Sequence, residues 1–208
     1  MEMIKIETFI MHQNVYIYFD AASKEGIIVD AGGDATRIID CIEENGIKVM
    51  AILLTHGHFD HIGAVDEVRK HTGAIVYSHE LEKNLVADSN LNLSKSLKKR
   101  DITVDVDETF RDGDVYSLGD TLLKVIHTPG HTPGCVCYYD EKNSKLFTGD
   151  TLFKEGIGRS DFPGGNINKL ISSVKGKIFN LPEGIEVFPG HGEATTIKYE
   201  KAFNPFVQ

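Results

Sequence analysis

The sequence has few cysteines, no long apolar run and a shortage of basic residues, and each absence excludes a class of protein. The three cysteines are an odd number without the spacing of a disulfide framework, which indicates reduced thiols in a cytoplasm. No apolar run approaches the roughly 20 residues that a membrane-spanning helix needs. Residues 1–6 lack the long apolar stretch of a signal peptide. We therefore expect a soluble, cytoplasmic protein without a membrane anchor.

The shortage of positive charge disfavours nucleic-acid partners. The 208 residues carry a formal net charge of −9, and an acidic surface repels a phosphate backbone. The one basic cluster, residues 95–100, is typical of a solvated helix face or loop. Because 41% of the residues are hydrophobic and no linker composition divides them, residues 1–208 are expected to form a single domain. The oligomeric state stays open.

Hydrophobic patterning predicts a mixed chain of strands and helices. Period-2 alternation and short apolar runs predict strands over residues 3–9, 14–19, 26–30, 49–54, 74–77, 121–126, 135–139, 145–147 and 184–188. Helical spacing predicts helices over residues 34–45, 62–71, 81–86 and 166–174. The polar residues 79–108 are weakly periodic, so after the short helix we expect a mobile segment that could cover a pocket.

One arrangement recurs four times: an apolar strand runs into a turn that carries histidine or aspartate beside a glycine. The turns contain His56, His131, Asp150 and His191. Strand ends are rigid and adjacent in a sheet, so residues far apart in the sequence can converge there. The glycines let the backbone turn sharply.

A metal centre explains these turns better than chance does. Alone, each polar residue would be an ordinary surface or core residue. Together, three histidines and one aspartate lie within six residues, directly after a buried strand, and further ones occupy matching turns. The candidate metal ligands are His56, His58, Asp60, His61, His131, Asp150 and His191.

The spacing within the first turn predicts two sites. His56 and His58 are two residues apart, so they project to the same side of an extended turn and can bind one ion. Asp60 and His61 are displaced along the loop and can bind a second. A carboxylate such as Asp150 can bridge two ions. The expected sets are His56, His58 and His131 for the first site, and Asp60, His61 and His191 for the second.

Such a centre predicts hydrolysis. Two divalent ions that share a water lower its pKa towards neutrality, and the resulting hydroxide can attack a carbonyl. Asp60 could orient the attacking water, and no serine or cysteine nucleophile is needed. Cys135 and Cys137 are most simply buried thiols, with a minor redox or metal role left open. Zinc is the default ion, although iron or manganese suits the same ligands.

The ligand pattern His56-x-His58-x-Asp60-His61, followed by His131, Asp150 and His191, resembles that of the metallo-β-lactamase superfamily. The resemblance implies an α/β (α+β) fold, a four-layer αββα sandwich with two metals at one edge. Asp30 resembles the early strand-end aspartate of the family, which supports the ligands through hydrogen bonds.

Asp150 places the resemblance in the glyoxalase II branch, because β-lactamases of this fold often have cysteine there. Residues 127–134, 158–165 and 199–206 look like the short bacterial glyoxalase II-like hydrolases called type II. Full-length glyoxalase II adds a C-terminal helical domain that binds glutathione carboxylates, and we expect no counterpart after His191. The substrate tyrosines of that family are also replaced. Arg159 could pair with a substrate carboxylate, or form a structural salt bridge to Asp161.

The leading hypothesis is hydrolysis of a small thioester of the hydroxyacylglutathione type, with acyl group and thiol open. The alternative is a persulfide dioxygenase of the same fold, with one iron held by two histidines and one aspartate and with loops like residues 158–162. A non-enzymatic metal-binding or sulfur-carrier module is the third. It is disfavoured because a closed zinc site needs four ligands, whereas seven are present. Charge disfavours a ribonuclease.

Overall fold

The computed structural model describes residues 1–9 and 11–207. Its first sheet has six strands in the order of the sequence, and its last three pairings are parallel. The strands are β1 (Glu2–Glu7), β2 (Asn14–Phe19), β3 (Glu25–Val29), β4 (Lys48–Leu53), β5 (Ile75–His79) and β6 (Glu108–Phe110).

The second sheet also has six strands, in the order β14-β13-β10-β9-β8-β7. They are β7 (Val115–Leu118), β8 (Thr121–His127), β9 (Val136–Asp140), β10 (Lys145–Gly149), β13 (Glu186–Pro189) and β14 (Thr195–Thr196). β10 and β13 are parallel, and the other pairings are antiparallel. A small hairpin follows β10 and consists of β11 (Leu152–Phe153) and β12 (Gly156–Ile157).

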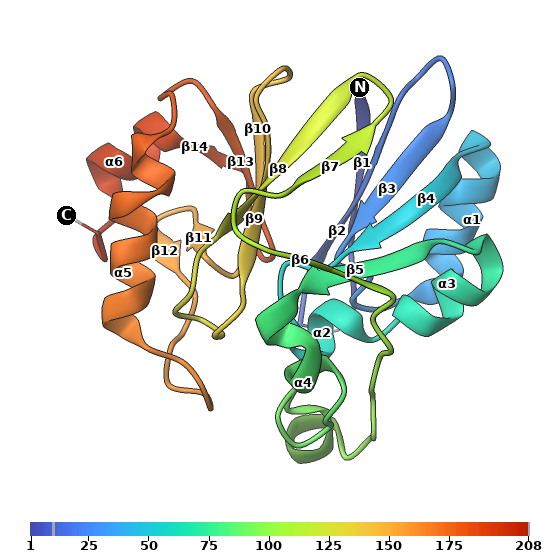
Figure 1. Ribbon diagram of the computed structural model, residues 1–208, viewed down its shortest axis with the longest axis horizontal. Helices are drawn as coiled ribbons and strands as arrows, with labels where there is room; N and C mark the ends of the chain where they lie inside the picture. Colours follow the sequence, from blue (N-terminus) through green and yellow to red (C-terminus); the bar gives the residue numbers. More distant parts are fainter. Residues whose placement is uncertain (10, 208) are drawn as a thin grey trace.

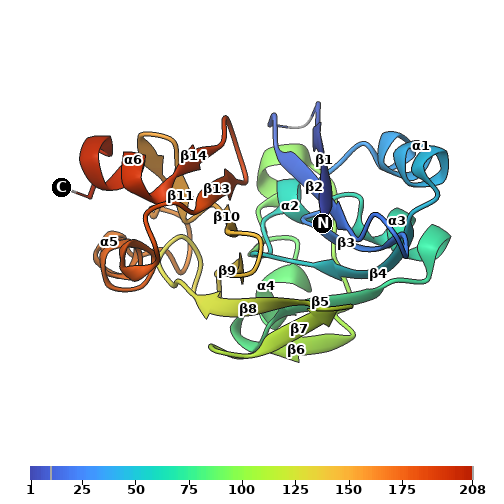
Figure 2. The same ribbon diagram turned by 90° about the horizontal axis from the view of Figure 1, so that it is seen from above.

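Helices cover both outer faces of the paired sheets (Figures 1 and 2). α1 (Ala35–Asn45) and α3 (Val65–Thr72) lie against the first sheet, and α5 (Ile167–Gly176) and α6 (Ile197–Phe203) against the second. The short elements are α2 (Phe59–Ile62), η1 (Glu80–Glu82), α4 (Lys83–Val86), the π-helix η2 (Ser94–Lys98) and η3 (Ile178–Asn180). Within the described residues, every helix is too short or too polar to cross a bilayer.

Three hydrophobic clusters hold the four layers together. One lies between the outer helices and the first sheet, one between the two sheets, and one between the second sheet and its helices. β2 shows how the sequence specifies this: Val15 and Ile17 face the helices, whereas Tyr16 and Tyr18 face the other sheet. The predicted αββα sandwich is confirmed.

Two elements differ from their predictions. The helix expected over residues 62–71 begins at Phe59, ends at Ile62 and resumes at Val65. It breaks because Ala64 donates its N–H to Ala31 O, 2.9 Å away, and not to a helical carbonyl. After α4, the polar segment is packed through contacts that its composition did not predict. Asn92 is buried, and its Nδ2 donates to Ile102 O at 2.7 Å.

Candidate metal centre

The four polar turns meet at one edge of the sandwich, the lower edge in Figure 1. β8, β10 and β13 all run in the same direction, so the turns after them emerge side by side. The turn after β4 reaches the same place from the other sheet, because Thr55 O accepts the N–H of Val136 at 2.9 Å. The topology thus brings together the turns that the sequence singled out.

Three imidazole nitrogens form the first group. His131 Nε2 lies 2.9 Å from His58 Nδ1 and 3.2 Å from His56 Nε2. All three side chains are buried. Donor atoms on a tetrahedral zinc ion stand roughly 3.3 Å apart, given bonds of about 2.0–2.1 Å. The group therefore has the donor chemistry and spacing of a zinc-like site.

A second group stands beside the first. His61 Nε2 lies 3.3 Å from His191 Nε2, and His191 Nε2 lies 3.4 Å from Asp60 Oδ2. Two imidazoles and a carboxylate suit zinc, iron or manganese. The residues expected for each of the two sites are therefore adjacent in the structure.

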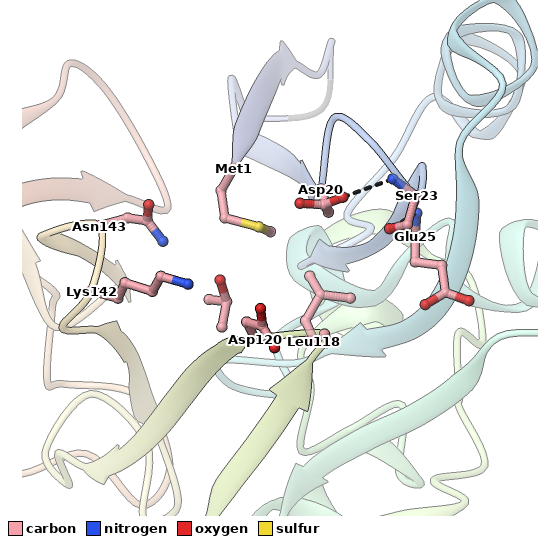
Figure 3. Close-up of a pocket in the computed structure, with 10 residues that line it drawn as sticks. Met1, Asp20, Ser23, Glu25, Leu118, Asp120, Lys142 and Asn143 are labelled. Carbon is pink, nitrogen blue, oxygen red and sulfur yellow. Dashed lines mark hydrogen bonds between the residues drawn. The ribbon is translucent and has the colours of Figure 1, made fainter.

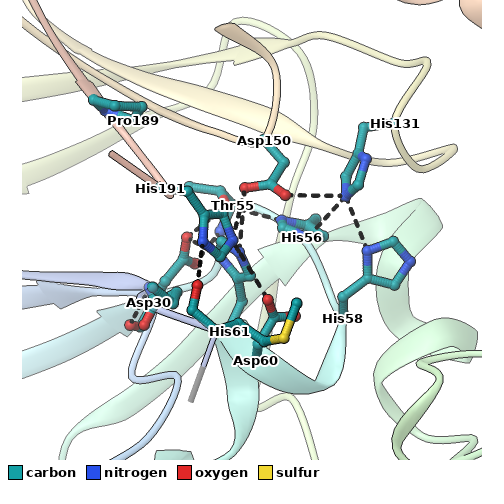
Figure 4. A network of polar contacts seen from close by, with 12 residues as sticks. Asp30, Thr55, His56, His58, Asp60, His61, His131, Asp150, Pro189 and His191 are labelled. Carbon is teal, nitrogen blue, oxygen red and sulfur yellow. Dashed lines mark hydrogen bonds and ion pairs between the residues drawn. The ribbon is translucent and has the colours of Figure 1, made fainter. Parts of the chain in front are cut away.

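Asp150 lies between the two groups (Figure 4). Its Oδ2 is 3.5 Å from His131 Nε2 in the first group. Its Oδ1 is 3.2 Å from His61 Nε2 and 3.6 Å from His191 Nε2 in the second. Each carboxylate oxygen therefore faces a different group, which is the arrangement of a bridging ligand.

Asp30 fixes the orientation of His61. Its Oδ2 lies 2.8 Å from His61 Nδ1 and accepts the Thr55 hydroxyl at 2.6 Å, while Oδ1 accepts the Thr55 N–H at 2.7 Å. Asp30 has a left-handed backbone, with φ of 55°, a conformation that aspartate and asparagine tolerate better than most residues. The carboxylate accepts from Nδ1 and leaves Nε2 of His61 facing the second group.

Backbone carbonyls orient two further imidazoles. His131 Nδ1 lies 2.6 Å from Arg159 O, and His191 Nδ1 lies 3.1 Å from Met11 O. Carbonyl oxygens only accept, so these Nδ1 atoms carry the protons and the Nε2 lone pairs point into the groups. His58 has the opposite orientation: its Nδ1 faces the first group, and its buried Nε2 has no hydrogen-bond partner in the described chain.

Burial keeps the first group neutral. It lowers the pKa of His56 well below the ordinary value, with the neighbouring imidazoles adding to the effect. It also lowers the pKa of His58 to about 3, and that of His131 in the same direction. Neutral imidazoles have the free lone pair that a metal requires.

The second group is held by charge. Burial opposes ionisation of Asp150, but the imidazoles around it, His61 first, lower the pKa of its carboxyl group. Burial is likewise outweighed at Asp60, where the hydrogen bond with His191 lowers the pKa. For His61, the carboxylates of Asp150 and Asp30 overcome burial and raise the pKa. The carboxylates that raise the pKa of His61 are the same ones that would interact with a metal cation at this group.

A pocket of about 140 Å³ opens onto both groups. The apolar side chains in its wall are Met11, Phe59, Leu93, Leu97 and Phe162. Arg159 also lines it, but its guanidinium forms two bonds to Asp161, at 2.8 and 2.7 Å, and lies 4.0 Å from the centre of the Phe162 ring. The sequence did not predict the Met11 and Leu93 contributions, because nothing local marks them.

Another polar pocket lies at the opposite end of the sandwich (Figure 3). It has a volume of about 330 Å³ and gathers the side chains of Met1, Asp20, Asp120 and Lys142 near the starts of β3 and β10. Neither histidine nor cysteine lines it, so it lacks the metal-binding donor atoms found at the other edge of the sandwich.

Cys135 and Cys137 are buried, as expected, and the Cys135 thiol donates to Thr128 O at 2.7 Å.

Comparison with known proteins gives the family. A model described as the metallo-beta-lactamase superfamily matches residues 10–191. A probable metallo-hydrolase of Bacillus subtilis, YqgX, is 42% identical over 191 residues, covering 91% of this chain and 90% of the relative. The hydroxyacylglutathione hydrolase GloC of Haemophilus influenzae is 35% identical over 208 residues, covering 99% and 97%.

Solved structures agree with this. BLEG-1, described as a B3 metallo-beta-lactamase, has a TM-score of 0.95 and 41% identity, with all of both chains covered. TTHA1623 in a di-iron-bound form has a TM-score of 0.86 and 31% identity, covering 98% of this chain and 99% of that one. ETHE1 from Myxococcus xanthus has a TM-score of 0.82 and 28% identity, covering 99% and 84%. The fold, the family match and the curated relatives together show that the chain belongs to the metallo-β-lactamase superfamily of metallo-hydrolases.

Proposed function

We propose that this protein is a dinuclear metal-dependent hydrolase of small thioesters of the hydroxyacylglutathione type. The observation that carries the proposal is the position of Asp150, whose two oxygens face different donor groups. The proposed ligands are His56, His58 and His131 for one ion, Asp60, His61 and His191 for the other, and Asp150 for both. The name of the GloC relative supports the thioester class.

Two divalent ions at these groups would supply a nucleophile at neutral pH by lowering the pKa of a water. Residues of the protein would orient the attacking water and the metal ligands. Asp60, which lines the pocket, orients the attacking water through its carboxylate. Asp30 and the carbonyls of Arg159 and Met11 keep the imidazoles in the required tautomer.

The pocket indicates which part of the substrate reaches the centre. Its small volume of about 140 Å³ and apolar wall fit a short acyl group, so the thiol part would lie at the mouth. Arg159 is exposed at that mouth, where it could meet a substrate carboxylate in competition with Asp161.

Iron-dependent persulfide oxidation is the second candidate. The similarity to ETHE1 favours it, and the di-iron form of TTHA1623 shows that a protein of this fold can bind iron, although that structure has two irons and the candidate enzyme would use one. A panel of S-lactoylglutathione, glutathione persulfide with oxygen uptake, and a β-lactam separates the classes. The thioesterase proposal predicts turnover of the first compound only.

The direct test compares S-lactoylglutathione hydrolysis by the wild type with that by His58→Ala. Removal of one proposed ligand should lower kcat/KM at least about 100-fold, since even residues behind metal ligands cost 10–100-fold when mutated. His71→Ala is the matched control, because His71 is a surface residue of α3 paired with Glu43. Unchanged activity of His58→Ala would refute the proposed centre.

A further inference from the structure

Glu82 is a buried carboxylate to which the proposed reaction assigns no role. Its side chain is fully buried, at 0% exposure. Its Oε2 accepts the N–H of Gly57 at 2.9 Å, and its Oε1 accepts the N–H of Gly134 at 2.7 Å. Gly57 lies between His56 and His58, and Gly134 is three residues after His131. One carboxylate therefore joins the two turns that carry the first group.

The contact with both turns is close because the two residues are glycines. A Cβ at Gly57 would lie 2.5 Å from Val86 Cγ1 and 2.7 Å from Leu85 Cδ2. A Cβ at Gly134 would lie 2.9 Å from Cγ of Glu82. η1 and α4 thus sit directly on the two turns, and a side chain at either glycine would push them away.

The buried Glu82 carboxylate needs hydrogen-bond donors to compensate for its loss of water. Among residues 1–9 and 11–207, no lysine, arginine or histidine forms an ion pair with Glu82. Burial raises the pKa of its carboxyl group, and the Thr132 side chain, then the backbone N–H groups of Gly134 and Gly57, oppose that shift. A buried anion is costly unless donors compensate it, so the two N–H groups and the carboxylate depend on each other.

We propose that Glu82 is a positioning residue for the first metal group, holding the His56–His58 turn and the His131 turn at the separation that metal binding requires. This inference rests on the proposed function. The two atoms concerned are His58 Nδ1 and His131 Nε2, which lie 2.9 Å apart in the structure. The second group depends on other contacts, from Asp30 and from Met11 O, so the effect of Glu82 is selective.

The test measures Co²⁺ affinity of each group separately, by titration of metal-free protein against a chelator. A His191→Ala background leaves the first group intact, and a His58→Ala background leaves the second. Glu82→Gln replaces one acceptor with an amide donor that faces a backbone N–H. It should weaken Co²⁺ binding about 10–100-fold in the first background and less than about threefold in the second.

Matched variants complete the design. Glu80→Gln removes an exposed glutamate of the same turn, paired with Arg111 at 2.9 Å, and should change neither affinity. Glu82→Asp keeps the charge with a shorter reach and should weaken the first group less than Glu82→Gln. It also gives the same comparison if Glu82→Gln does not fold, as judged by thermal unfolding. Equal losses at both groups, or none at the first, would overturn the inference. Absence of Co²⁺ binding by the wild type would instead overturn the proposed function on which it rests.

Discussion

His61 and Asp30 form a pair in which a fully buried imidazole points its Nδ1 at a carboxylate 2.8 Å away. Asp30 lies at the end of β3, and His61 lies in α2, directly after the turn that follows β4. Since β3 and β4 are parallel neighbours, their ends place the two residues together. The family resemblance pointed to Asp30 as a support for the ligands, whereas its pairing with His61 comes from the structure.

The first prediction concerns that pair. Asp30→Asn should weaken metal binding at the second group about 10–100-fold. The amide oxygen can replace only one of the two carboxylate oxygens, so the NH2 group must face either the Thr55 N–H or the His61 Nδ1–H and the Thr55 hydroxyl. Asparagine tolerates the left-handed backbone at this position, so the substitution adds no backbone strain that could itself lower the metal affinity. A zinc titration against a chelator measures the effect. Asp34→Asn, at a residue with φ of 54° and no contact with the centre, should behave as wild type; equal affinity for both variants would contradict the role of Asp30.

The second prediction concerns the shared carboxylate. Asp150→Asn leaves one oxygen acceptor and turns the other atom into a donor, so only one of the two groups keeps an oxygen ligand from this side chain. We expect the metal content to fall towards one ion per chain and thioester hydrolysis to fall at least about 100-fold. Elemental analysis and a thioesterase assay measure both. Asp66→Asn, on the exposed face of α3, is the control. Two ions retained by Asp150→Asn would show that the carboxylate does not bridge.

The third prediction concerns Arg159. Arg159→Gln should raise KM for S-lactoylglutathione about fivefold with kcat unchanged, because an exposed charge pair is worth up to about 1 kcal/mol. The backbone carbonyl that orients His131 remains in place. Steady-state kinetics beside Arg111→Gln, another exposed arginine, checks this. An unchanged KM would mean that the guanidinium serves only Asp161.

The fourth prediction is a pH dependence away from the centre. Burial, followed by the charge of the stacked His127 ring at 4.2 Å, lowers the pKa of His79 from 6.5 to about 4. The unfolded chain therefore binds this proton first as the pH falls. The stability present above pH 6.5 is lost progressively down to pH 4, amounting to about 2 kcal/mol at pH 5.

His79→Asn tests that dependence, since asparagine can replace the cap that His79 gives to Leu81 N–H without titrating. Urea unfolding at pH 7 and pH 5 should show a smaller acid loss for His79→Asn than for wild type. Other acid-sensitive groups are common to both proteins and cancel in the difference. His12→Asn, at an exposed histidine, should keep the wild-type loss. Equal acid losses in all three would disprove the assignment to His79.

Much of the fold could be predicted because its strands carry their own pattern. β2 alternates valine and isoleucine with tyrosine, and both sets are buried on opposite faces. The short strands β6, β7, β11, β12 and β14 were not predicted, because two to four residues are too few for a period to show. The break after Ile62 depends on the hydrogen bond from Ala64 N–H to Ala31 O, which no local sequence pattern predicts.

The site likewise contains residues that the sequence could predict and residues that it could not. The seven polar residues could be selected because histidine and aspartate beside glycine at strand ends are chemically distinctive, and the structure brings them together. Glu82, Met11 and Leu93 could not be selected. Their roles arise only from contacts with turns that lie elsewhere in the sequence.

The metal content of the purified wild-type protein tests the central claim most directly. After dialysis against metal-free buffer, elemental analysis should find about two divalent ions per chain, one for each group that Asp150 faces. One ion or fewer per chain would contradict a dinuclear centre built on His56, His58, Asp60, His61, His131, Asp150 and His191.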